Sequence, residues 1–209
     1  MDIPLFILFG AIGYLLGSIP NAYIVVKASH GKDLRNEGSG NIGTLNAYEV
    51  TGSKDTGKWV LFLDVMKGAI PITAAVAFFE SGFITSSILL VSLVLGHNYS
   101  PWIGFRGGRG LATAAGALLV YNPYFLLVWL SVWGITHVIR KDIHVANIAA
   151  TVLLPLIVYF TPDFTKALAW FGEEDPESAV IAIGVLSFVI FVRHIDPLMQ
   201  LIRQKASTE

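Results

Sequence analysis

The sequence predicts an all-α membrane protein, a polytopic bundle of about seven transmembrane helices. Hydrophobic residues make up 54% of the 209 residues and charged residues only 14%, and the mean hydropathy is +0.65. Apolar runs recur along the whole chain, and short segments between them hold most of the charges. These observations argue against a soluble fold and for a single membrane domain over residues 1–209.

Seven apolar segments are candidates for membrane spans. They are 4–26, 58–79, 84–97, 110–121, 123–140, 145–161 and 178–193. Several are shorter than the roughly twenty residues that cross a bilayer comfortably. The first segment follows Asp2 and Pro4 without a basic start, so we interpret it as a retained span and not a cleaved signal. Asn122 and Pro123 form a tight turn, which predicts an antiparallel helix pair around it.

Basic residues predict the orientation of the bundle. With seven spans, the loops on one side hold only Lys166, and the other Lys and Arg residues fall on the opposite side, apart from Lys67 inside the second segment. By the positive-inside rule the C-terminus is then cytoplasmic and the N-terminus lies outside. All five histidines map to the cytoplasmic side, where we therefore expect the functional site. They are His30, His97, His137, His144 and His194.

The most informative stretch is GHNYSPWIGFRGGRGLATAAG at 96–116, a glycine-rich loop with two arginines between two apolar segments. Glycines let the backbone come close to a ligand, and Arg106 and Arg109 offer fixed guanidinium donors. The apolar run from Leu111 can supply the positive end of a helix. The stretch predicts an anion site, most simply for phosphate.

Another glycine-rich stretch, GSGNIGTLNAYEVTG at 38–52, follows the first span. Its small polar side chains could hydrogen-bond a phosphate or a glycerol hydroxyl, although the same composition also suits a flexible linker. These side chains are Ser39, Asn41, Thr44 and Asn46. Neither glycine-rich stretch is a Walker A loop or a dinucleotide-binding turn.

Asp64 and Lys67 lie three residues apart inside the second apolar segment. This spacing puts both on one face of a helix, where a charge pair costs less than two separate ions in lipid. We expect the pair to face the protein interior, and we favour a structural ion pair over direct contact with a substrate.

In order and spacing, GSGNIG, then D-x-x-K-G, then GHNYSPWIGFRGGRGLAT resemble the bacterial acyl-phosphate glycerol-3-phosphate acyltransferases, the PlsY family. The likeness covers nearly the whole chain. That family reads GSGN-x-G-A-T-N in the first loop and GH-x-x-P-x-x-x-x-F-K-G-G-K-G-x-A-T in the second, and here Arg106 and Arg109 occupy both lysine positions. The resemblance implies a multi-pass protein of the bacterial cytoplasmic (inner) membrane with its active site facing the cytosol.

The implied reaction transfers a fatty acyl group from acyl phosphate to the 1-hydroxyl of glycerol-3-phosphate, giving lysophosphatidic acid for phospholipid biosynthesis. An acyl phosphate is already activated by its leaving group, so positioning and charge stabilisation suffice. The absence of cysteine also excludes a thiolate nucleophile. We expect no cofactor, no metal and no nucleic acid. The expected partners are acyl phosphate, glycerol-3-phosphate and membrane lipids, and the working expectation for the oligomeric state is a monomer.

The resemblance also implies roles for individual residues. Arg106 and Arg109, with the backbone amides of 107–110, would bind the phosphates. His97 would orient or deprotonate the attacking hydroxyl, although the leaving phosphate could take that proton itself. The full candidate set is His97, Arg106 and Arg109 as catalytic residues, Ser39, Gly40, Asn41, Gly107, Gly108 and Gly110 as phosphate-binding residues, and Asn46, Lys67, His144, Asn147 and His194 as further candidates.

Several positions depart from the family pattern. Glu49 stands where the first motif reaches an arginine, and an acid repels phosphate at close range. His144 and Asn147 replace a pair of serines, and Pro197 replaces an asparagine near the C-terminus. These changes cluster where glycerol-3-phosphate should bind, so a divergent paralogue with another acceptor is an alternative.

Other interpretations have weaker support. His137 and Asp142 form an H-x-x-x-x-D string, the signature of other glycerolipid acyltransferases, which we interpret as a chance spacing. A small transporter or lipid-binding membrane protein also fits an apolar bundle with a basic face, but the chain shows no convincing internal repeat. A phosphatidyl-transfer enzyme would need a run of metal-binding aspartates, which the sequence lacks.

Overall fold

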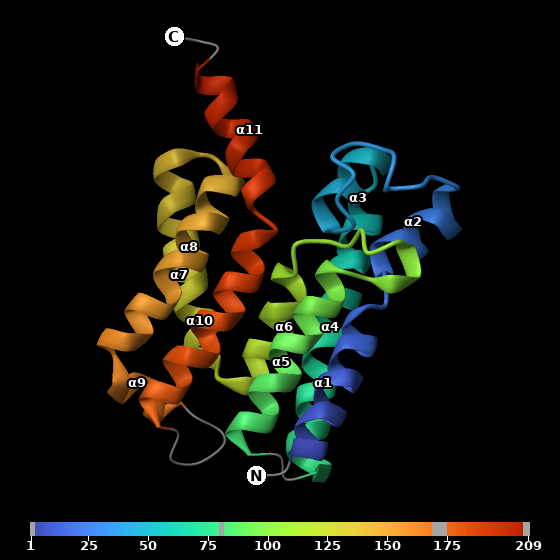
Figure 1. The fold of residues 1–209 in the computed structure, drawn as a ribbon. Coiled ribbons are helices and arrows are strands. Elements are labelled where there is room, and N and C mark those ends of the chain that lie inside the picture. Colours follow the sequence, from blue (N-terminus) through green and yellow to red (C-terminus); the bar gives the residue numbers. More distant parts are fainter. Residues whose placement is uncertain (1–2, 80–81, 169–174, 207–209) are drawn as a thin grey trace. The chain divides into compact units, whose positions relative to one another are not determined.

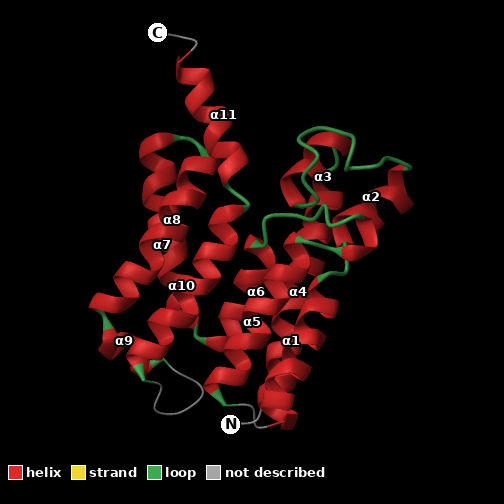
Figure 2. Cartoon of the chain, in the orientation of Figure 1, coloured by secondary structure: helices red, strands yellow, loops and turns green. Residues whose placement is uncertain are grey.

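The computed structural model describes residues 3–79, 82–168 and 175–206, and within these ranges every regular element is a helix (Figure 2). The all-α prediction is therefore confirmed. The chain forms two compact units, Met1–Tyr121 and Asn122–Glu209. Figure 1 labels the helices of both units.

The first unit contains the two glycine-rich loops. Its long helices pack in two close pairs, α1 along α5 and α4 along α6, and α4 and α6 both also contact α5. The short helices α2 and α3 pack on α4 and on each other. The helices are α1 Ile3–Gly17, α2 Asn21–His30, α3 Thr44–Thr51, α4 Lys54–Phe79, α5 Phe83–Asn98, the 3-10 turn η1 Pro101–Ile103 and α6 Leu111–Tyr121.

In the second unit, α8 packs against both α7 and α10. Three helices begin where a side-chain carbonyl or carboxylate accepts hydrogen bonds from backbone amides of the first turn, at Asn122, Asp142 and Asp175. Hydrogen bonds from the hydroxyl of Ser178 and, to a lesser degree, from backbone amides lower the pKa of the Asp175 carboxyl. The helices are α7 Pro123–Arg140, α8 Ile143–Phe160, α9 Pro162–Ala167, α10 Pro176–Val192 and α11 Ile195–Ala206.

Each predicted apolar segment corresponds to a helix or a helix pair, but the first is interrupted. Segment 4–26 was expected as one helix, whereas α1 ends at Gly17 and α2 begins at Asn21. The helix breaks at Pro20, because a proline has no backbone amide to donate the hydrogen bond of a continuing helix. The sequence analysis also missed α3, which lies inside the first glycine-rich loop, and the amphipathic α11.

Four helical stretches of the described chain are long and apolar enough to cross a membrane. They are Ile3–His30, Lys54–Phe79, Phe83–Ile103 and Ile143–Phe160. Two further apolar helices, α6 and α10, are shorter. The expected total of seven spans and the orientation of the termini stay predictions.

Glycines allow the helices of the first unit to approach each other closely. A Cβ added to Gly116 would collide with the carbonyl oxygen of Val65, and one added to Gly68 would collide with that of Thr113. The same holds between α1 and α5, where a Cβ on Gly96 would strike the carbonyl oxygen of Tyr14. Small residues at such crossings are the usual way in which membrane helices gain packing contacts.

A single added methyl group should therefore distinguish the α4–α6 crossing from an open helix surface. We expect Gly116→Ala to lower the melting temperature of the detergent-solubilised protein by several degrees. Gly184→Ala is the matched control, because a Cβ there meets nothing within 4 Å. Alanine favours a helix over glycine by about 1 kcal/mol, so the control should be neutral or slightly stabilising. Equal melting temperatures for the two variants would contradict the close crossing.

Candidate active site

The second glycine-rich loop connects α5 to α6 and folds back on the end of α5. The amide of Phe105 donates to the Ser100 carbonyl (2.8 Å), that of Gly107 to the Asn98 carbonyl (3.2 Å) and that of Gly108 to the His97 carbonyl (3.1 Å). These hydrogen bonds fix the path of the loop over the end of α5.

Three long-range hydrogen bonds fasten this loop to the end of α1. The Tyr14 hydroxyl donates to the Tyr99 carbonyl (2.6 Å), and the Ser100 hydroxyl donates to the Ser18 carbonyl (2.6 Å). The Trp102 indole N–H donates to the Ser18 hydroxyl (2.8 Å). The loop is therefore held on the break between α1 and α2.

The buried glycines of this loop serve close packing, and the phosphate-binding role expected of their amides stays a prediction. Gly107 and Gly108 were expected to offer their amides to a phosphate, but those amides already donate to carbonyls of α5. A Cβ on Gly107 would strike the carbonyl oxygen of His97, and one on Gly108 would lie 2.6 Å from that of Ile42. Only glycine fits at both positions. Gly110, with φ +80°, turns the chain into α6.

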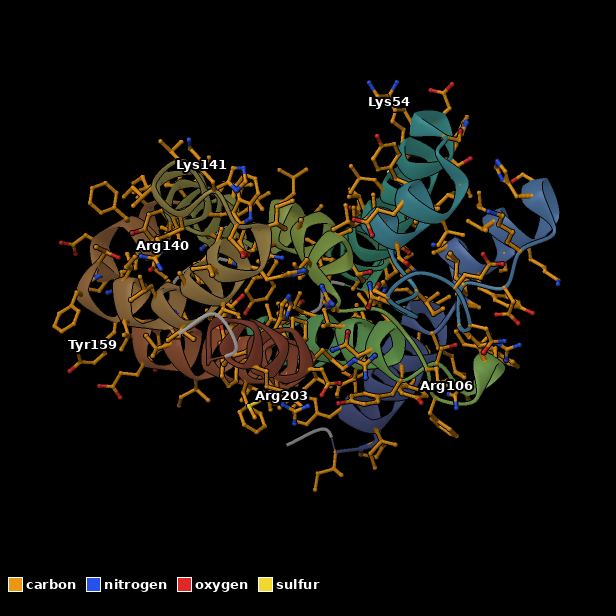
Figure 3. The ribbon with its side chains drawn as sticks, turned by 90° about the horizontal axis from the view of Figure 1, so that it is seen from above. Lys54, Arg106, Arg140, Lys141, Tyr159 and Arg203 are labelled. Carbon is orange, nitrogen blue, oxygen red and sulfur yellow. The ribbon has the colours of Figure 1, made fainter. Side chains whose placement is uncertain are left out.

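The two arginines of the loop differ in burial. Arg106 is exposed, and Figure 3 shows it at the outer edge of the loop. Arg109 is half-buried and precedes α6 by two residues. The amides of the first turn of a helix have no carbonyl partners within that helix, so the start of α6 adds positive character beside Arg109.

The first glycine-rich loop is organised by one side chain of α3. Asn46 is 1% exposed, and its Oδ1 accepts from the Ser39 amide (2.9 Å). Its Nδ2 donates to the carbonyls of Asn41 (2.9 Å) and Glu37 (3.2 Å). Asn46 is also a ligand-binding candidate, a role that stays a prediction, and both ends of its amide are engaged by the loop backbone. A flexible linker does not describe this loop.

The two glycine-rich loops lie together. Ile42 of the first loop and Ile103 of the second belong to one buried apolar cluster, and the Ile42 carbonyl faces Gly108. The cluster consists of Ala22, Val26, Leu34, Ile42, Ala47, Val60 and Ile103. In the same loop as Ile42, Ser39 is exposed and Gly40 and Asn41 are half-buried. The structure therefore brings the phosphate-binding candidates of both loops to one end of the first unit.

A cation of the first loop is already engaged by a neighbouring acid. Arg35 forms a two-pronged hydrogen bond with Asp33, whose carboxylate accepts from Nε (3.0 Å) and from the terminal guanidinium nitrogen (2.7 Å). The guanidinium hydrogen bonds lower the pKa of Asp33 to about 2. Arg35 also lies over the ring of Tyr23, 5.1 Å from its centroid. Glu49, the acid that departs from the family pattern, is exposed on α3.

Asp64 and Lys67 form a buried ion pair, as the sequence predicted. The Lys67 ammonium lies 2.9 Å from the Asp64 carboxylate and donates to the Ile19 carbonyl (2.9 Å). The Asn21 side-chain amide donates to the same carboxylate oxygen (3.1 Å). The pair therefore connects α4 to the break between α1 and α2. No sequence pattern singled out Asn21, because a single asparagine at a helix start is ordinary.

His97 lies beside this pair. Its Nδ1 is 3.1 Å from the Thr113 hydroxyl and 3.9 Å from the Asp64 carboxylate. A Cβ on Gly108 would collide with its Nε2, and the side chain is 7% exposed. His97 therefore joins α4, α5, α6 and the second loop. This packing suits a residue that positions the loop better than one that reaches a substrate hydroxyl.

The remaining candidates belong to the second unit. Asn147 is 7% exposed and accepts from the Trp133 indole N–H (2.8 Å). His194 is fully buried after the end of α10, with Nδ1 2.9 Å from the Ile190 carbonyl. His144 is half-buried in the first turn of α8.

The H-x-x-x-x-D string does not form a catalytic dyad. The Asp142 carboxylate accepts from the amides of His144 (2.7 Å) and Val145 (3.0 Å) and so caps α8. The ring of His137 instead stacks on that of Trp133 at a centroid distance of 5.0 Å. Within the described ranges, no three His, Asp or Glu side chains are placed to hold a metal ion together.

The chain is similar to known proteins over nearly its whole length. The family model described as glycerol-3-phosphate acyltransferase matches residues 7–204. Glycerol-3-phosphate acyltransferase of Syntrophotalea carbinolica is 31% identical over 189 residues, which are 90% of each chain. That of Fusobacterium nucleatum is 36% identical over 158 residues, 75% of this chain and 79% of the relative.

Two solved structures have a similar fold. The crystal structure of PlsY, an integral membrane glycerol 3-phosphate acyltransferase, in its glycerol 3-phosphate form, superposes with a TM-score of 0.78 at 30% identity, covering 95% of this chain and 92% of that one. Its lysophosphatidic acid form gives a TM-score of 0.76 at 28% identity, with the same coverage of both chains. With the family model matching nearly every residue, this chain belongs to the glycerol-3-phosphate acyltransferase family.

Proposed function

We propose that this chain transfers a fatty acyl group from acyl phosphate to the 1-hydroxyl of glycerol-3-phosphate at the cytosolic face of a bacterial cytoplasmic membrane. The products are lysophosphatidic acid and inorganic phosphate, and the reaction serves phospholipid biosynthesis. The observation that carries this proposal is the meeting of the two glycine-rich loops at one end of the first unit, with Arg106 and Arg109 beside the start of α6. Family membership supports the acceptor.

The chemistry needs positioning more than a protein nucleophile. The hydroxyl oxygen of the acceptor attacks the acyl carbonyl carbon, the bond from that carbon to the phosphate oxygen breaks, and phosphate leaves with the electron pair. The mixed anhydride is already activated, so charge stabilisation of the leaving phosphate is the main contribution of the protein. The leaving phosphate also takes the proton of the hydroxyl. His97 is packed against Gly108, which suits a residue that positions the loop.

In this proposal Arg106 and Arg109 bind phosphate oxygens, aided by the start of α6. Ser39, Gly40 and Asn41 border the phosphate from the first loop, which Asn46 holds in shape. Gly107, Gly108 and His97 position the second loop, and Asp64 and Lys67 support His97. Contacts of His144, Asn147 and His194 with the acceptor stay predictions that rest on the family resemblance.

The experiment that tests the function is phosphate release from palmitoyl phosphate by detergent-purified protein without added metal. We expect release that depends on glycerol-3-phosphate, with lysophosphatidic acid as the lipid product. Release that does not depend on glycerol-3-phosphate would point to another acceptor or to hydrolysis. The acid Glu49 would favour an acceptor without a phosphate group. A requirement for Mg²⁺ would contradict the acyl-phosphate mechanism.

Removing either arginine should slow turnover. A hydrogen bond to a charged group contributes roughly 1.5–3 kcal/mol, so Arg106→Ala and Arg109→Ala should each lower the rate by about tenfold or more. Arg140→Ala is the matched control, because Arg140 is an exposed arginine at the end of α7. Wild-type rates in both loop variants would remove these arginines from the site.

The pH profile should distinguish a positioning role of His97 from proton abstraction. We expect His97→Gln to lower kcat while the shape of the rate profile between about pH 5 and 8, where a histidine normally titrates, stays that of the wild type. Thr113→Val tests the same contact from α6 and should have a similar but weaker effect. If His97→Gln abolishes the acidic limb of the profile, His97 is the proton acceptor after all.

A further inference from the structure

The second glycine-rich loop carries two exposed aromatic side chains at the end of a candidate span. That span runs from Phe83 to Ile103 and so includes α5 and η1. Trp102 is 64% exposed and Phe105, two residues beyond the span, is 60% exposed. We call Trp102 and Phe105 the aromatic tip. The exposed Arg106 follows it directly.

The backbone holds Phe105 in an unfavourable conformation. Its φ of 60° lies in the left-handed region, which bulky side chains rarely adopt, and it follows Gly104 with φ 70°. The hydrogen bond from the Phe105 amide to the Ser100 carbonyl maintains this turn. Strained residues of this kind persist where the surrounding structure over-determines them, and they cluster at functional positions.

Trp102 is fixed at one end and exposed at the other. Its indole N–H donates to Ser18, which is fully buried at the end of α1. The carbonyl of Ser18 also accepts a hydrogen bond from the Ser100 hydroxyl, so the loop that carries the tip is fastened twice to the same residue. An amphipathic ring with its polar group satisfied and its apolar body uncovered is typical of a membrane–water interface.

We propose that the aromatic tip lies in the interfacial layer of the bilayer, between the headgroups and the acyl chains, and holds Arg106 at the depth of the lipid phosphates. The tip continues a candidate span, so it lies where that span leaves the hydrocarbon. The guanidinium beside it complements phosphate in charge and shape. Lipid, and not a protein partner, is therefore the occupant that fits this surface.

This position has a consequence that rests on the proposed function. An acyl phosphate dissolved in the membrane keeps its chain in the hydrocarbon and its phosphate among the headgroups. The tip then places Arg106 where the phosphate of an arriving donor lies. The depth of the tip itself does not depend on which reaction the protein catalyses.

The absence of cysteine makes the depth measurable with single-cysteine variants. Phe105→Cys is labelled with an environment-sensitive fluorophore in vesicles of phosphatidylethanolamine and phosphatidylglycerol. Lipids with a nitroxide at the headgroup or in mid-chain serve as quenchers. The controls are Asn36→Cys, exposed between α2 and α3, and Phe188→Cys, exposed on the apolar helix α10.

We expect the probe at Phe105 to be quenched more by the headgroup nitroxide than by the mid-chain nitroxide. The probe at Phe188 should show the opposite order, and the probe at Asn36 should respond only to a water-soluble quencher such as iodide. A Phe105 probe that behaves like the one at Asn36 would show a tip in water, open to a protein partner, and would overturn the proposal. A Phe105 probe that is quenched more by the mid-chain nitroxide, as expected for Phe188, would place the tip in the hydrocarbon and would also overturn the proposal.

Kinetics test the link to the donor. Phe105→Gly suits this purpose, because glycine tolerates the positive φ and the loop can keep its path. We expect a severalfold higher KM for palmitoyl phosphate in vesicles with kcat unchanged, no effect on a water-soluble short-chain acyl phosphate, and recovery in Phe105→Trp. An unchanged KM would refute this link. A wild-type protein without turnover would instead count against the proposed function, and the quenching result would still decide the depth of the tip.

Discussion

The buried Asp64–Lys67 ion pair is the interaction on which the first unit depends. It reaches the helix break through Ile19 and Asn21, and it lies beside His97, which contacts α6 and the second loop. Removing one member of such a pair leaves an uncompensated charge, which costs roughly 3–5 kcal/mol. A pair that looks structural in the sequence thus ties α4 to the helix break and lies beside the histidine on which the second loop packs.

Close backbone contacts give the second loop its shape. The second loop buries few apolar side chains, so its shape comes from loop amides that donate to carbonyls of α5 and from hydrogen bonds to the carbonyl and hydroxyl of Ser18. Glycine at 107 and 108 permits these contacts. The glycines that first suggested a phosphate cradle let the two loops pack closely against each other and against the end of α5.

The sequence predicted most of the helices and singled out the two glycine-rich loops, because apolar runs and glycine-rich motifs are local signals. It placed the interior pair correctly, since a spacing of three residues defines a helix face. It could not predict that the first segment breaks at Pro20, that Asn46 is consumed by its own loop, or that His97 is covered by Gly108. The break at Pro20 has a local cause, the missing proline amide, that the continuous apolar run conceals. The contacts of Asn46 and His97 depend on how each loop folds back on its neighbouring helix, which no local pattern contains.

The first glycine-rich loop requires an amide side chain, and not a carboxylate, at position 46. Its Nδ2 donates to backbone carbonyls while its Oδ1 accepts from an amide, within a side chain that is almost fully buried. Aspartate has nearly the same shape, but its carboxylate would place a negative oxygen against those carbonyls. An aspartate at this position would therefore disrupt the first loop without changing the volume of any side chain, so the loop selects its residue by hydrogen-bond donors and not by shape.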